Sequence, residues 1–413
     1  MRDDTPAATH QPAAAGCDHP SAGQTPPALP VALRARVAPS FAYSVVFTRD
    51  LLNSFALDLA GVFGRAETPL HLLPVVDDGL LAGGFLPRLQ RGLAELSGAT
   101  GLRIFAPHIV PGGEVAKNDP AHLAAVYDAL QRADLCRHSY VMALGGGAVL
   151  DVAGYAAATA HRGVRLVRVP STVLAQADSG VGVKNGINAF GRKNFLGTFA
   201  PPHAVVCDQA LLRTLSDRDW RAGMSEAVKV AMIKDAAFFA WLEEHAAALV
   251  ARDEDAMQQL IGRSAALHVA HIANAGDPFE QGSARPLDFG HWAAHKLEQM
   301  TRYALRHGEA VAIGMALDTE YAARTGLIDE PAARRLPDLL RALGLPTTLP
   351  ASIDPQELLA GLAEFRAHLG GRLCITLPTA VGSATEVHTI DQSVMARGLR
   401  PLTPDPSPLT PHP

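Results

Sequence analysis

The chain has 413 residues, of which 48% are hydrophobic and 19% are charged, and its net charge at pH 7 is −5. A chain of this length and composition buries a large core and has room for two domains. The negative charge argues against a general nucleic-acid binder, and no apolar run is long enough to cross a bilayer. The four cysteines are scattered without a CxxC pair, which is typical of a reducing compartment and predicts a cytoplasmic protein.

Both ends of the chain differ in composition from its middle. Residues 1–38 are rich in Ala, Pro, Ser and Thr without a periodic apolar pattern, and residues 398–413 are rich in proline. Segments of this kind cannot bury a core, so we predict two disordered tails. The first tail lacks the basic start and continuous apolar stretch of a secretory signal.

The two halves of the chain between these tails have different periodicities. In the first half, short β-type runs alternate with helical patterns; strands are expected at 41–47, 71–76, 102–105, 140–144, 164–169 and 203–207, and helices at 85–96, 121–133 and 148–160. This alternation predicts a Rossmann-like, doubly wound α/β domain over residues 39–211.

The second half, residues 212–397, has a helical pattern throughout. Helices are expected at 219–245, 253–275, 289–303, 309–325, 331–343 and 355–368, which predicts an all-α second domain. The cleft between the two domains is then the expected position of a ligand site.

Asp77 directly follows the second predicted strand. An acidic residue at this position commonly binds a ribose hydroxyl. The alternative is that Asp77 and Asp78 only cap the next helix, and the sequence leaves both interpretations open.

A glycine run, Gly145 to Gly147, lies between a predicted buried strand and a predicted helix. Close backbone approach and a helix N-terminus together form a site for an anion. The run departs from the dinucleotide fingerprint, because Leu150 stands at the third glycine position, so a simple tight turn is the alternative. The ionisable segment after the strand at 164–169 favours a ligand site; it contains Asp178, Lys184, Lys193 and Asn194.

The second half contains residues suited to a metal. His291 and His295 stand four residues apart on one helix face, and Glu226 and Lys229 stand three apart on another, while His307 begins a predicted helix. One glutamate and two histidines are typical of a catalytic zinc site with an open coordination position. Since the chain has 17 histidines, chance pairs are expected, and spacing alone leaves a surface or capping role open.

Taken together, these motifs resemble the 3-dehydroquinate synthase family, the sugar phosphate cyclases. The resemblance covers roughly residues 41–395. The stretches that carry it are residues 145–154, 162–163, 170–179, 184, 191–194, 226–229, 290–291 and 307–309.

The resemblance implies a cofactor, a metal and a set of substrate contacts. Zn²⁺, with Co²⁺ as an alternative, would be bound by Glu226, His291 and His307. NAD⁺ would lie across the first domain, at Asp77, Glu114, Lys117, Gly146, Gly147, Asp151 and Thr172. The sugar phosphate would face Asp178, Lys184, Lys193, Asn194, Lys229, Asp288 and His295, and Arg162 would reach its phosphate from the other subunit of a homodimer.

The chemistry implied by the resemblance is a phosphorus–oxygen lyase reaction without net oxidation. A secondary hydroxyl is oxidised by NAD⁺, and the new ketone acidifies the adjacent C–H so that phosphate leaves. The ketone is then reduced by the same NADH, and an intramolecular aldol step closes the ring.

The sequence departs from the 3-dehydroquinate synthase pattern where a substrate carboxylate would bind. Ala284 stands at an arginine position with Arg285 one place later, Asp288 replaces an asparagine, and Ala270 replaces a lysine; the C-terminal Asp-Lys-Lys is also missing around residues 365–371. Losing cations and gaining an anion disfavours an acidic substrate. This resembles the 2-epi-5-epi-valiolone synthase type and predicts sedoheptulose 7-phosphate as substrate.

Two alternatives remain open. Arg285 could restore carboxylate binding, which would make the chain a 3-dehydroquinate synthase. A metal-dependent polyol or alcohol dehydrogenase is the second, and such an enzyme would have no use for Arg162, Lys184, Lys193 and Asn194.

Overall fold

The computed structural model describes residues 40–63, 70–274, 286–368 and 371–399, together with residues 35, 37 and 279. The described residues from Ala42 onward belong to one compact unit. The two predicted tails lie almost entirely outside the described residues. Within those residues, no helix is both long and apolar enough to cross a membrane.

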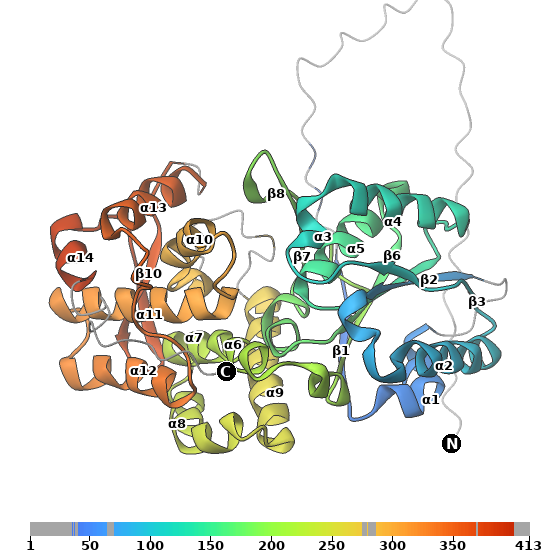
Figure 1. Cartoon of the computed structure of the whole chain (residues 1–413), viewed down its shortest axis with the longest axis horizontal. Coiled ribbons are helices and arrows are strands. Elements are labelled where there is room, and N and C mark those ends of the chain that lie inside the picture. Colours follow the sequence, from blue (N-terminus) through green and yellow to red (C-terminus); the bar gives the residue numbers. More distant parts are fainter. Residues whose placement is uncertain are drawn as a thin grey trace, which may run out of the picture. The chain divides into compact units, whose positions relative to one another are not determined.

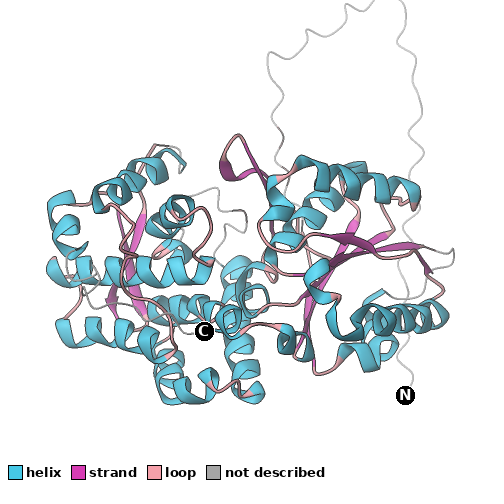
Figure 2. Cartoon of the chain, in the orientation of Figure 1, coloured by secondary structure: helices cyan, strands magenta, loops and turns pink. Residues whose placement is uncertain are grey.

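Seven described strands form one parallel sheet in the first half of the unit (Figures 1 and 2). From one edge, the order is β1 (Ser44–Thr48), β9 (Ala204–Asp208), β6 (Arg165–Pro170), β5 (Tyr140–Gly145) and β2 (His71–Asp77), with β3 (Arg103–Ile104) and β4 (His108–Val110) both beside β2. Parallel pairing throughout confirms the predicted α/β domain.

Helices cover both faces of this sheet, as Figure 1 shows. Alternating residues of β5 point to opposite sides: Tyr140 and Met142 pack with α1 (Leu51–Phe63) and α2 (Phe85–Thr100), while Val141 packs with α4 and α5. The latter helices are Pro120–Arg132 and Gly147–Thr159, and the short α3 (Val115–Asn118) lies near them. A strand that is apolar on both faces belongs in such a doubly covered sheet.

The polar segment after β6 contains an unpredicted element. It begins with η4 (Ala175–Ser179), one turn of π-helix, and continues as an antiparallel hairpin of β7 (Lys184–Ala189) and β8 (Arg192–Phe199). Phe190 and Gly191 both have positive φ, as a two-residue hairpin turn requires. The mostly exposed face of β8 hides its strand pattern, so the sequence indicated only a polar segment.

The second half is mainly helical, as predicted. Its helices are α6 (Asp217–Ala222), α7 (Ser225–Lys234), α8 (Ala236–Val250), α9 (Glu254–Asn274), α10 (His291–Met300), α11 (His307–Arg324), α12 (Glu330–Ala342), α13 (Pro355–His368) and α14 (Gln392–Leu399). It also contains an unpredicted hairpin of β10 (Ile375–Ala380) and β11 (Ser383–Val387). Helix α14 runs two residues into the predicted C-terminal tail, whereas the division at residues 211 and 212 stays a prediction.

The predicted long helix over 219–245 is wrong in one respect, because the chain forms α6, α7 and α8 there. At the first break, a Cβ on Gly223 would lie 2.5 Å from the Cβ of Val173, so glycine allows the segment after β6 to approach closely. At the second, Asp235 accepts a hydrogen bond from Phe238 N at 2.9 Å and caps α8. The first break places Glu226 in the first turn of its own helix.

Candidate active site and metal centre

Three helix starts bring the predicted metal ligands together. Glu226 lies in the first turn of α7, while His291 and His307 are the first residues of α10 and α11. One ligand atom from each of the three residues lies within 4.8 Å of the others. Glu226 is 1% exposed; its Oε2 forms an ion pair with Lys229, whereas its Oε1 faces both imidazoles. A buried carboxylate is stable only beside positive charge, and a metal ion between Oε1 and the two imidazoles would add to that charge.

The orientation of His291 strengthens this interpretation. Its Nδ1 lies 3.1 Å from the carbonyl oxygen of Phe289, which can only accept, so Nδ1 carries the proton. Burial, followed by the charge of Lys229, lowers the pKa of His291 and keeps the ring neutral. Its Nε2 lone pair therefore faces Glu226 Oε1 at 3.6 Å. Two electron-rich atoms face each other here, as they do around a bound metal.

His307 stands between two carboxylates. Its Nδ1 lies 3.2 Å from Glu298 Oε2, and its Nε2 lies 3.4 Å from Glu226 Oε1. Burial alone would lower the pKa of His307, but Glu298 and Glu226 outweigh it and raise the pKa to about 9. We call Glu226, His291 and His307 the metal corner. This corner favours positive charge between His307 and Glu226, and its donor set of one carboxylate and two imidazoles fits Zn²⁺.

Other predicted substrate residues surround this corner. Lys229 forms a buried ion pair with Glu226, three residues earlier on α7. The ring of His295 lies 5.5 Å from that of His291, and burial keeps its pKa well below the usual value. Burial would lower the pKa of Lys229, but Glu226 and Asp178 raise it, and Asp288, which ends the turn before Phe289, adds a smaller contribution of the same sign. Lysine, imidazole and carboxylate groups therefore meet at one place.

Asp178 lies in η4 and pairs with a histidine that the sequence analysis did not single out. Its Oδ1 lies 2.8 Å from Nδ1 of His268 on α9. Burial would raise the pKa of Asp178, but Lys229 and His268 outweigh burial and lower the pKa. Asp178 is thereby an anion held against the helical half.

The sheet half forms a backbone cradle at the carboxyl ends of its strands. Asp77 accepts hydrogen bonds from Gly79 N at 2.9 Å and from Gly146 N at 3.2 Å. The first of these is the capping role left open above. A Cβ on Gly147 would lie 3.0 Å from Ser179 Oγ, and one on Gly146 would lie 3.3 Å from Thr172 Cγ2. The glycines therefore allow η4 to pack against the start of α5.

Lysines tie this cradle to the hairpin of β7 and β8. Lys117 donates to Asp151 Oδ2 at 2.5 Å and also to Asn194 Oδ1. Lys193 donates to Glu298 Oε1 at 2.7 Å and lies 3.6 Å from Glu114 Oε1. Burial would lower the pKa of Lys193, but the two carboxylates outweigh it and raise the pKa.

Two predicted site residues lie at exposed positions of the chain. Lys184 is exposed at the start of β7, and Arg162 is exposed with a φ of 62°. Among the residues that the structure describes, no hydrogen bond or ion pair links Arg162 to the other predicted site residues. Arg285, the alternative carboxylate ligand, lies outside the described residues.

Arg168 of β6, which is 0% exposed, holds the segment between η4 and β7. It donates to the carbonyl oxygens of Gly180, Gly182 and Lys184 at 3.1, 2.7 and 2.8 Å, and to Asn185 Oδ1 at 2.6 Å. The predicted strand contains two arginines, Arg165 and Arg168, and the sequence does not show which of them is buried.

Asp318 of α11 anchors the start of α10. It is fully buried and accepts hydrogen bonds from Gly290 N at 2.9 Å and from Trp292 Nε1 at 2.8 Å, on either side of His291. Gly290 has a φ of 78°, and a Cβ there would lie 2.7 Å from Met315 N. In the sequence, the only indication of this role is that Asp318 follows a long apolar stretch of α11.

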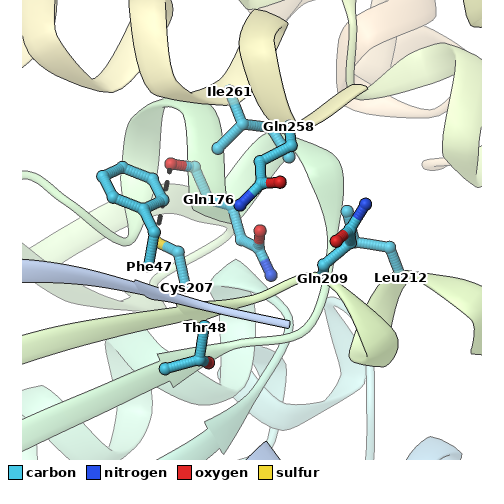
Figure 3. A pocket seen from close by; sticks show the side chains of 8 residues that line it. All are labelled: Phe47, Thr48, Gln176, Cys207, Gln209, Leu212, Gln258 and Ile261. Atoms are coloured by element: carbon cyan, nitrogen blue, oxygen red, sulfur yellow. Dashed lines mark hydrogen bonds between the residues drawn. The ribbon is translucent and has the colours of Figure 1, made fainter. Parts of the chain in front are cut away.

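A separate hollow lies beside the sheet edge (Figure 3). The residues that line it are Phe47, Thr48, Gln176, Cys207, Gln209, Leu212, Gln258 and Ile261. Burial raises the pKa of Cys207, so none of these side chains carries a charge at neutral pH. The hollow therefore lacks the groups that would bind a phosphate.

Comparison with known proteins decides the family. Two family models match consecutive parts of the chain: the N-terminal model of 3-dehydroquinate synthase over residues 107–222 and its C-terminal model over residues 223–365. A 3-dehydroquinate synthase of Ruegeria sp. (strain TM1040) is 39% identical over 349 residues, which cover 83% of this chain and 90% of that protein. The chain belongs to the 3-dehydroquinate synthase family.

Two solved structures of other synthases have the same fold. A 2-epi-5-epi-valiolone synthase from Streptomyces hygroscopicus subsp. jinggangensis 5008, solved with NAD⁺ and Zn²⁺ bound, is 30% identical with a TM-score of 0.80, covering 90% of this chain and 99% of that chain. A 2-deoxy-scyllo-inosose synthase complexed with carbaglucose-6-phosphate, NAD⁺ and Co²⁺ is 23% identical with a TM-score of 0.71, covering 86% of this chain and 96% of that chain, and adds to the fold comparison alone. The fold and family predicted from the sequence are confirmed.

Proposed function

We propose that this chain is an NAD⁺- and Zn²⁺-dependent sugar phosphate cyclase whose substrate is a neutral heptulose phosphate, sedoheptulose 7-phosphate. The cyclase class follows from the family. The observation that supports a metal is the neutral His291, whose Nε2 faces a buried carboxylate oxygen of Glu226 without a proton between them. The relative solved with NAD⁺ and Zn²⁺ supports the same pair of cofactors for this chain.

In this proposal Glu226, His291 and His307 would hold Zn²⁺ and the sheet cradle would hold NAD⁺; when bound, the metal would supply acidification of a secondary hydroxyl and the cofactor a reversible hydride acceptor. The protein's own groups orient the sugar and its phosphate. Lys193, held between Glu298 and Glu114, is a fixed cation for phosphate oxygens. Lys229 and Asp178 lie beside the metal ligands and hold the sugar hydroxyls in a reactive orientation.

The preference for a neutral substrate rests on Asp288 and Ala270. Asp288 stands three residues before His291, and its negative charge acts on both Lys229 and His291, so a carboxylate lies beside the proposed position of the sugar. A substrate carboxylate would meet this anion, whereas sugar hydroxyls can donate to it. Ala270 on α9 provides no cation to offset the repulsion.

A phosphate-release assay with two substrates tests the proposal. Purified protein loaded with Zn²⁺ and NAD⁺ is incubated with sedoheptulose 7-phosphate or with the heptulosonate phosphate. We expect phosphate release from the neutral sugar without a lasting rise in NADH absorbance, because the cofactor is regenerated. Faster release from the heptulosonate phosphate would contradict the proposed substrate, and accumulation of NADH without phosphate release would indicate a dehydrogenase instead.

3-Dehydroquinate synthase is the second candidate. It is favoured by the names of several relatives, among them a protein of Xylella fastidiosa (strain 9a5c) that is 34% identical over 379 residues, covering 90% of this chain and 93% of that protein. The two candidates share the fold and the proposed metal site and differ in the group that faces Asp288.

We also propose a homodimer in which Arg162 of one copy completes the site of the other. The exposed side chain of Arg162, for which the described part of the chain shows no hydrogen bond or ion pair to the other site residues, supports this arrangement. Hybrid dimers of Arg162→Ala and His291→Ala chains test it. If Arg162 acts across the interface, one site of the hybrid carries both changes and the other carries neither, so about half of the wild-type activity returns. No recovery would place Arg162 in the site of its own chain.

A further inference from the structure

Glu298 joins two parts of the site that have separate roles in the proposed function. It lies in the third turn of α10, seven residues after His291, and is 3% exposed. One of its oxygens, Oε2, lies 3.2 Å from Nδ1 of His307, and the other, Oε1, accepts from Nζ of Lys193 at 2.7 Å. The same carboxylate thus contacts a proposed metal ligand and a lysine of β8.

We propose that Glu298 is a positioning residue for the metal centre. By accepting from Nδ1, it fixes the tautomer and rotation of His307 so that Nε2 points at Glu226, and Lys193 holds Glu298 in this position. The inference rests on the proposed function in taking the metal to be Zn²⁺. Helix α10 then provides one ligand, His291, and the support of another, His307.

The chemistry of the contact explains why a carboxylate is needed. Both neighbours of Glu298 are donors: Lys193 has no acceptor, and His307 must donate from Nδ1 if Nε2 is to bind a metal. A glutamine of the same shape has one acceptor and one donor group. It can satisfy either His307 or Lys193, and its NH₂ then faces the other donor.

The position of His307 shows what Glu298 prevents. The His307 ring lies 5.5 Å from that of His291 and 6.3 Å from that of His295, so other imidazoles border it on two sides. Without a fixed acceptor at Nδ1, the proton could move to Nε2, which would then be lost as a ligand. Carboxylates that orient ligating histidines in this way typically change metal affinity about 10–100-fold when they are removed.

The first test compares Glu298→Gln with a matched control, Glu364→Gln. Glu364 of α13 also pairs with a lysine of α10, Lys296, at the same 2.7 Å, and among the described side chains it forms no ion pair with a histidine. Zinc dissociation constants are measured by chelator competition, and NAD⁺ dissociation constants by titration. We expect Glu298→Gln to raise the zinc constant about 10–100-fold and Glu364→Gln to leave it unchanged, with NAD⁺ binding intact in both. Wild-type zinc affinity in a folded Glu298→Gln protein would overturn the proposal.

A second measurement distinguishes positioning from a general loss of structure. In protein labelled with ¹⁵N-histidine, the Nδ1–H of His307 should give an exchange-protected signal that is lost in Glu298→Gln while the other histidine signals stay in place. This readout needs no metal. If wild-type protein binds no zinc, the proposed function is wrong, but the His307 signal still tests the role of Glu298. A protected signal that persists in Glu298→Gln overturns the inference about Glu298 itself.

Lys193→Met tests the second contact. If Lys193 affects the metal only by holding Glu298, this change weakens zinc binding in wild-type protein and has no further effect in Glu298→Gln. An equal loss in both backgrounds, or none in wild-type protein, would remove Lys193 from the proposed link.

Discussion

The sheet half and the helical half contribute to the site in different ways. At the ends of β2 and β5, the groups are already paired: Asp77 accepts two backbone hydrogen bonds, and Lys117 is paired with Asp151. At the starts of α7, α10 and α11, by contrast, Oε2 of Glu226 pairs with Lys229 while its Oε1 faces two imidazoles. The first region is arranged by backbone shape, and the second by charge.

The two halves should therefore respond differently to substitutions. Backbone cradles depend on close packing, so steric changes there affect folding and cofactor binding together. The charged corner depends on a cation, so removing a ligand affects metal content and turnover more than the fold. Four substitutions test this separation, from the largest expected effect to the smallest.

His291→Ala should abolish turnover and metal binding while the sheet half stays folded. A bound metal contributes several kcal/mol to catalysis, so we expect the rate to fall by at least about 10³-fold. NAD⁺ affinity should stay within about twofold, because the residues proposed to bind the cofactor lie in the sheet half and do not include His291. The measurements are phosphate release, metal analysis and NAD⁺ titration, with His245→Ala on α8 as the control. Full activity after complete zinc removal from wild-type protein would contradict the metal mechanism.

Arg168→Met should mainly destabilise the sheet half. It removes the donors for three carbonyl oxygens and Asn185 while filling similar space. Each unsatisfied buried acceptor costs about 1–3 kcal/mol, so with four acceptors the free energy of unfolding should fall by at least about 4 kcal/mol in denaturant titrations. Arg213→Met, which breaks an exposed pair with Glu254, should cost at most about 1 kcal/mol. Equal losses for the two variants would show that Arg168 does not hold this segment.

Gly145→Ala should weaken NAD⁺ binding without affecting the metal. The added Cβ would lie 2.8 Å from the Cβ of Asp77 and 2.9 Å from that of Val149, and neither atom can move without its backbone. Such overpacking costs about 1–3 kcal/mol and displaces Asp77. Gly98→Ala on α2 is the control, because its Cβ would meet nothing within 4 Å. Loss of zinc in Gly145→Ala would show that the two halves are not separable.

The sequence predicts more of the ligand set than of its support. Glu226, His291 and His307 are recognisable because their types and neighbours repeat a family pattern, and the α/β alternation is recognisable because β5 is apolar on both faces. Glu298, Arg168 and Asp318 hold those elements by contacts over distances in sequence that no local pattern encodes. The spacing of His291, His295 and Glu298 on one helix face is the one signal that could have revealed Glu298.

Exposure hides further elements from sequence analysis. The hairpin of β7 and β8 has an exposed outer strand, so its alternation is lost, and only Gly191 marks its turn. The break between α6 and α7 depends on a close approach of Val173 to Gly223, which is a tertiary contact. Elements of this kind can be located only in the folded structure.

Asp288→Asn should have the smallest effect, on substrate choice. A hydrogen bond from a sugar hydroxyl to a charged acceptor contributes about 1.5–3 kcal/mol, part of which asparagine retains, so kcat/KM for sedoheptulose 7-phosphate should fall about tenfold. The same change removes an anion from the site, so the ratio of kcat/KM for the heptulosonate phosphate to that for the neutral sugar should rise. Phosphate release measures both.

Asp338→Asn, an exposed change on α12, is the matched control and should leave both rates as they are. Zinc content should also be unchanged in Asp288→Asn, because this residue is not among the three that meet at the metal corner. If the two rates fall together with zinc content, Asp288 supports the ligands instead of selecting the substrate. If neither rate changes, the exclusion of a carboxylate must come from the missing cation at Ala270, and Ala270→Lys becomes the change that should admit the acid.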